Sequence, residues 1–186
     1  MINTTKEVLR SGGQGFTFDQ MNTDLYIVVR WIHAIAAAAW FGEVVVINFV
    51  LIPTLSKYQG VARKDFLNTI FPRVFRLASV LALTTAITGG VLLYHYVGFE
   101  IGQLFERGSW GISIFIGGLM GLILTLFHFF MENLLAKRIG VGDPNISETA
   151  VEDVHLKLKL VPRLGLVVIT VIFVMMMNAK YSLILW

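Results

Sequence analysis

Long apolar runs along the chain are separated by short segments that carry most of its charge. Residues 77–99 and 108–131 contain no Asp, Glu, Lys or Arg, and residues 26–53 contain only two charged side chains. A helix crosses the ~30 Å hydrocarbon core of a bilayer with about 20 apolar residues, so each run is long enough. A fourth run, 164–179, reaches that length with its apolar flanks. The pattern predicts four membrane-spanning helices, over about 26–53, 72–99, 108–137 and 160–181.

Composition agrees with a membrane protein. Hydrophobic residues make up 56% of the chain and charged residues 15%, whereas soluble domains carry about 25% charged residues. The absence of cysteine excludes disulfides, thiolate metal sites and cysteine nucleophiles. No phosphate loop, dinucleotide-binding glycine signature or zinc-peptidase spacing is present. We therefore expect an all-α, integral membrane, antiparallel four-helix bundle over residues 26–186, preceded by a polar tail at 1–25.

The basic residues indicate an orientation. The connections between the first and second helices and between the third and fourth hold ten Lys and Arg residues near the helix ends. Five lie on the opposite side of the membrane. Cytoplasmic connections carry the excess of Lys and Arg. This predicts cytoplasmic connections and both termini outside, in a prokaryotic-type plasma (inner) membrane. The net charge is only +3, so the basic residues are read as topology signals and no nucleic acid is expected as a partner.

Two histidines are expected at similar depth near the outer face. His33 lies about 10 Å into the first helix, and His95 lies about 6 Å before the end of the second. Imidazole is a common ligand of haem iron and also suits copper. A pair of histidines from neighbouring helices could hold a haem b or a copper ion between them. The alternative is that each histidine hydrogen-bonds to a neighbouring helix.

Three further ionisable residues lie inside the predicted spans. His128 is a third candidate for cofactor binding, and Glu132 follows it by one helical turn, where a carboxylate can orient an imidazole. Glu132 could instead pair with a basic residue at the membrane edge. Glu43 lies near the middle of the first helix, where a charge costs at least ~2.5 kcal/mol. It is either a proton or ion carrier, or a structural group paired with another helix or with Asn48.

Several short motifs carry a family resemblance. Residues 33–42 read His-Ala-Ile-Ala-Ala-Ala-Ala-Trp-Phe-Gly, and Pro53 follows near the helix end. This resembles the opening helix of the copper-resistance protein D (CopD-like) family and of the HemJ-type protoporphyrinogen oxidases. Phe-Arg-Leu-Ala at 75–78 and Val-Pro-Arg-Leu at 161–164 are also similar to these families. His-Leu-Lys-Leu at 155–158 is similar to a segment of the HemJ type.

The resemblance covers roughly residues 26–179. It implies a four-helix bundle with a haem b site, with His33 as a ligand, and in the HemJ type it also implies a role for Lys157. In the CopD-like family it implies copper uptake. Glu43 departs from the small or apolar residue usual after Trp-Phe-Gly in these families, and neither His95 nor His128 matches a family position.

Three functional hypotheses follow. The leading one is a b-type-haem electron-transfer protein, acting alone or as a small subunit of a larger membrane redox complex. The second is copper uptake or handling along His33, Glu43 and His95. The third is a structural subunit without a cofactor. We expect an electron-transfer or accessory subunit rather than a stand-alone enzyme, with the lipid bilayer and other membrane subunits as its partners.

Overall fold

The computed structural model describes residues 18–98, 100–139 and 148–181, and the side chains of residues 23–98, 100–134 and 160–179. Every element in these ranges is a helix. Four helices are long and apolar enough to cross a membrane, which confirms the prediction of an all-α membrane helical bundle. They are α1 (Phe18–Val46), α3 (Gly60–Val97), α5 (Gly108–Ile139) and α6 (Glu148–Tyr181).

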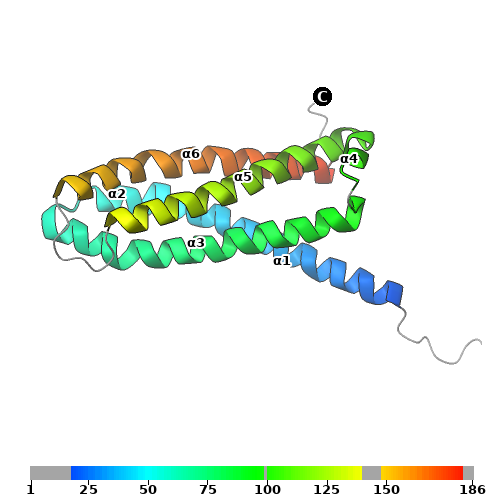
Figure 1. Cartoon of the computed structure of the whole chain (residues 1–186), viewed down its shortest axis with the longest axis horizontal. Coiled ribbons are helices and arrows are strands. Elements are labelled where there is room, and N and C mark those ends of the chain that lie inside the picture. The colour runs from blue at the N-terminus through cyan, green and yellow to red at the C-terminus, as the bar shows by residue number, and fades with distance from the viewer. Residues whose placement is uncertain (1–17, 99, 140–147, 182–186) are drawn as a thin grey trace, which may run out of the picture.

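The four long helices lie side by side and run in alternating directions (Figure 1). The main pairings are α1 with α3 and α5 with α6, and α3 joins the two pairs through α5. α1 reaches α6 with its second half, where the ring of Phe41 lies 5.1 Å from that of Phe173. Figure 1 shows the first part of α1 leaving the other helices, and the two ends of the described chain lying at the same end of the bundle.

Three helices begin before their predicted starts. α1 begins at Phe18 rather than at residue 26, within the segment expected to be a polar tail. α3 begins at Gly60 rather than at residue 72 and passes through Pro72. α6 begins at Glu148 rather than at residue 160 and passes through Pro162. A proline removes one backbone hydrogen bond, which neighbouring groups in a membrane bundle can replace. The amphipathic segments before both prolines therefore continue the helices instead of forming loops.

The end of the first span changes its helical pitch. A π-helix, η2 (Ile47–Leu51), follows α1 and leads into the short α2 (Ile52–Leu55). Single π turns are frequent at functional sites. Asn48 lies in this turn, and its Nδ2 donates to the carbonyl of Val44 at 2.8 Å and to that of Pro162 at 2.9 Å. The wider turn is thus tied to α6.

The apolar interior is narrow. One cluster joins all four long helices at a single level through Trp40, Ala82, Leu124 and Ile169. A second cluster, of Leu55, Leu67 and Phe71, lies where α2 meets α3. Most other large apolar side chains point outward, as expected for a protein whose surface contacts lipid.

A short helix, α4 (Gly102–Glu106), lies across the turn between α3 and α5. The fully buried Leu104 anchors it against Gly111 of α5. A Cβ at residue 111 would lie 1.7 Å from the Leu104 carbonyl oxygen. The absence of a side chain at this glycine is therefore what lets α4 pack against α5.

Candidate functional site

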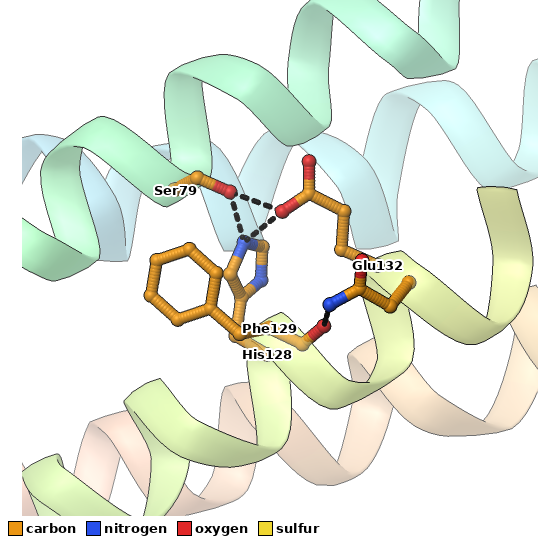
Figure 2. Close-up of polar contacts among 5 residues, drawn as sticks. Ser79, His128, Phe129 and Glu132 are labelled. Carbon is orange, nitrogen blue, oxygen red and sulfur yellow. Dashed lines mark hydrogen bonds and ion pairs between the residues drawn. The ribbon is translucent and has the colours of Figure 1, made fainter.

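Polar side chains of α3 and α5 meet inside the bundle (Figure 2). The Ser79 hydroxyl oxygen lies 3.0 Å from His128 Nε2 and 2.5 Å from Glu132 Oε2. His128 Nε2 and Glu132 Oε2 are 3.9 Å apart, too far for a direct hydrogen bond. The side chains of His128 and Glu132 are 15% and 30% exposed. These three residues form the polar cluster, in which Ser79 bridges two ionisable groups.

The hydroxyl of Ser79 carries one proton, and its oxygen can also accept a bond. When Ser79 donates to the Glu132 carboxylate, its oxygen is free to accept the N–H of His128. When Glu132 carries the proton, it donates to Ser79, which then donates to a bare Nε2 of His128. The same three heavy atoms therefore accommodate one proton at either end of the polar cluster.

Aromatic rings cover the imidazole of His128. The ring centroids of Trp40 and Phe75 each lie 6.4 Å from it, and that of Phe129 lies 5.7 Å away. Trp40 also belongs to the apolar cluster shared by all four long helices. The rings keep lipid and water away from much of the imidazole, and hydrogen bonds are stronger in such a low-dielectric setting.

Glu43 lies at the level of the polar cluster, on α1. It follows Trp40 by three residues and lies close to the backbone of Ala78, the residue before Ser79. Both of its carboxyl oxygens are buried, and neither has a hydrogen-bond partner among the described residues. The structure does not pair Glu43 with Asn48, whose amide donates elsewhere. A buried carboxylate without a partner is costly, which favours the neutral acid at this position.

His33 is held against α3. Its Nδ1 lies 3.0 Å from the Thr85 carbonyl oxygen and 3.2 Å from the Thr88 hydroxyl. Gly89 makes room for the ring, because a Cβ there would lie 3.0 Å from Cε1 of the imidazole. A carbonyl only accepts, so Nδ1 carries the proton and Nε2 keeps its lone pair. A metal-binding histidine commonly takes this tautomer.

The structure does not bring His33 and His95 to one level. His95 is exposed in the last turn of α3, and its ring stacks on that of Tyr26 with the centroids 4.8 Å apart. Seven residues on α1 separate Tyr26 from His33, which is about 10 Å along a helix. Counting from the expected ends of the spans could not reveal this offset, because helix register depends on packing.

The three candidate histidines thus occupy different places. His33 contacts the second half of α3, His95 contacts Tyr26 at one end, and His128 lies in the polar cluster. Within the part of the chain whose side chains are described, no three His, Asp or Glu residues lie close enough together to hold a metal ion. The side chain of Lys157, implied by the HemJ resemblance, lies outside those residues.

Sequence reasoning missed Ser79. Its neighbours at 75–78 form a family-like motif, but the serine has no charge and lies in a long apolar run. Only the register of α3 against α5 places it between His128 and Glu132. The helical spacing of these two residues indicated that they lie near one another, and the structure adds the bridging hydroxyl.

No protein-family model, curated protein or solved structure matches this chain. The resemblance to CopD-like and HemJ-type helices therefore stays an expectation from short motifs.

Proposed function

We propose that this chain transfers protons within the membrane, through the polar cluster of Ser79, His128 and Glu132. The supporting observation is that one hydroxyl oxygen lies within hydrogen-bond distance of both an imidazole and a carboxyl group. Ionisable residues inside membrane spans commonly form proton relays. An imidazole is suited to this work because its ordinary pKa lies near neutrality.

The transfer conserves its protons. A proton that arrives at Glu132 passes to the Ser79 oxygen while the original Ser79 proton moves to Nε2 of His128. Ser79, which now holds the proton that came from Glu132, donates a hydrogen bond to the Glu132 carboxylate, and the imidazolium of His128 releases its excess proton from Nδ1 to water. Reorientation of the hydroxyl and the ring resets the polar cluster. No bond between heavy atoms changes, so no co-reactant is needed.

The proposal is tested with purified protein in liposomes that contain a pH-sensitive dye. A potassium diffusion potential set by valinomycin drives protons across the membrane. We expect wild-type vesicles to change internal pH faster than empty ones. Ser79→Ala should reduce the rate to that of empty vesicles, because the remaining 3.9 Å gap between imidazole and carboxyl exceeds a hydrogen bond. Wild-type vesicles that behave like empty ones would refute proton transfer by this chain.

Two controls are available on the same helices. His95→Gln removes an exposed histidine on α3, the helix of Ser79. Asn133→Ala alters the residue next to Glu132. The side chain of Asn133 is exposed, and its Nδ2 donates to the Phe129 carbonyl of its own helix at 3.0 Å. Both variants should conduct protons as the wild type does. If Ser79→Ala also conducts normally, the hydroxyl is not on the path.

A second candidate function is electron transfer by a b-type haem, and one observation favours it. His33 has the tautomer and the free Nε2 that an iron ligand requires. His95 does not fit as the opposite ligand in this arrangement, because it lies about 10 Å further along the helix pair. A bound haem would supply one-electron chemistry. The test is the absorption spectrum of the purified protein: a Soret band that His33→Ala abolishes and His95→Gln retains would support this function.

Copper handling and a purely structural role have no comparable observation in their favour.

The proposed orientation, with both termini outside, has a direct test. The chain has no cysteine, so single cysteines at Gln59 and Ile101 would report the two ends of the bundle. With a membrane-impermeant maleimide on intact cells, Ile101→Cys should react and Gln59→Cys should not. The reverse pattern would place both termini in the cytoplasm.

A further inference from the structure

An aromatic cluster occupies the end of the bundle where α1, α3 and α5 meet. Tyr26 stacks on His95, and the hydroxyls of Tyr26 and Tyr96 are hydrogen-bonded. The ring of Tyr96 meets the ring of Trp110 edge-on, with the centroids 5.3 Å apart. This cluster lies where the apolar span of α3 ends at Val97. Tyr and Trp gather at this level of a bilayer, beside the lipid headgroups.

Two arginines flank the aromatic cluster. The guanidinium of Arg107 lies over Trp110 at 5.5 Å from the ring centroid, and its Nη2 donates to the Tyr96 carbonyl at 3.2 Å. Arg30 follows Tyr26 by one helical turn, and both arginines are near enough to Tyr96 to act on it electrostatically. Both are exposed. Arg107 thus has most of its five N–H donors available for a ligand.

Three carboxylates also lie at this end of the bundle. Asp24, Glu100 and Glu106 are exposed, and among the described side chains none forms an ion pair with Arg30 or Arg107. Glu100 instead accepts a hydrogen bond from Gln103 at 2.5 Å. Neither guanidinium group is therefore held in an ion pair with a described carboxylate, and both keep N–H donors available for a phosphate.

We propose that Arg30 and Arg107 bind the phosphate of an anionic phospholipid. Guanidinium groups recognise phosphate through paired N–H donors. The source is a lipid rather than free phosphate because large apolar side chains adjoin both arginines. Trp31 is 66% exposed beside Arg30, and Phe105 is 53% exposed beside Arg107. A phospholipid satisfies both features at once, since its acyl chains cover these side chains while its phosphate meets the guanidiniums.

The site is independent of proton transfer and is tested on the full-length protein. Native mass spectrometry would count the lipids that the protein retains from an equimolar mixture of phosphatidylglycerol and phosphatidylcholine with identical acyl chains. We expect the wild type to prefer phosphatidylglycerol. Each arginine near a membrane surface contributes about fivefold to the binding of anionic lipid, so Arg30→Gln and Arg107→Gln should each lower the preference by about that factor. Gln103→Ala, which changes an uncharged side chain at the same end of the bundle, should leave it unchanged.

Three results would overturn the proposal. Equal retention of the two lipids by the wild type does so without any variant, which keeps the test valid if a variant fails to fold. A folded variant lacking both arginines that retains the full preference does so as well. Displacement of phosphatidylglycerol by millimolar inorganic phosphate would assign the site to a free anion instead. Arg107→Lys, which keeps the charge but loses the paired donors, should retain part of the preference.

Discussion

Replacement of Gly111 by alanine tests the packing of α4 on α5. The added Cβ would lie 1.7 Å from the carbonyl oxygen and 2.6 Å from the carbonyl carbon of Leu104. These atoms belong to the backbone, so no side-chain rotation relieves the overlap. Leu104 is fully buried. Only Arg107 lies between α4 and α5, whose first residue, Gly108, has a φ of +64°. The short helix must therefore move away as a unit.

The magnitude follows from two opposing effects. Alanine is favoured over glycine inside a helix by about 1 kcal/mol. Overpacking of a well-packed site costs about 1–3 kcal/mol, and occasionally more. Because the clash at Leu104 is with the backbone, we expect the upper part of that range and a net loss of about 2 kcal/mol. Gly118→Ala is the matched control, since residue 118 is exposed on the same helix and nothing lies within 4 Å of its Cβ position.

The assay is unfolding of the purified protein in mixed micelles by added SDS, followed by far-UV circular dichroism. Gly111→Ala should unfold at a lower SDS fraction than the wild type, and Gly118→Ala at the same fraction or a higher one. Movement of α4 should also disturb Arg107 and Trp110, so Gly111→Ala should weaken the preference for phosphatidylglycerol. Equal stability of the two alanine variants would refute the close packing of α4 on α5.

Two further predictions concern contacts between helices, and a third concerns Glu43. The buried Asn178 amide donates to the Ser113 hydroxyl at 2.7 Å. In a double-mutant cycle measured by SDS unfolding, Asn178→Ala and Ser113→Ala should therefore show a coupling free energy of about 0.6–1.7 kcal/mol. Additive effects of the two substitutions would contradict this bond. Gly89→Ala should be less stable than Gly90→Ala in the same assay, because only residue 89 contacts the imidazole of α1. Glu43→Gln should keep wild-type stability but slow proton flux in liposomes, since neither carboxyl oxygen has a hydrogen-bond partner among the described residues. A marked loss of stability would indicate a structural role.

The number and type of the helices could be predicted from the sequence because an uncharged run of about 20 residues has few alternatives in a membrane protein. The helix ends could not. Pro72 and the polar residues before it look like a connection, yet α3 continues through them because charged residues are tolerated beyond the membrane edge. The π turn was equally hidden, since the bond that ties Asn48 to α6 joins positions 114 residues apart.

The candidate site could be predicted only in part, because spacing along one helix can be counted in the sequence but the register between helices cannot. Spacing along one helix placed His128 near Glu132, because residues four apart share a face. Contacts between helices depend on register, which the interlocking of side chains sets. Counting from the span ends gave His33 and His95 similar depths, whereas the stacking of His95 on Tyr26 puts them on different levels. Ser79 became a candidate only once the register of α3 and α5 was known.

The polar groups inside the bundle differ in how well their hydrogen bonds are satisfied, and this difference bears on function. A residue that joins helices makes at least one bond between them, as Nδ2 of Asn178 does with Ser113, although Oδ1 of Asn178 has no partner among the described residues. Among the described residues neither carboxyl oxygen of Glu43 has such a bond, although a buried acid there lowers the stability of the span. A purely structural subunit would gain nothing from that cost. A chain that moves protons needs an acid that can lose its proton and take it back, and a group with no competing hydrogen bond is free to do so.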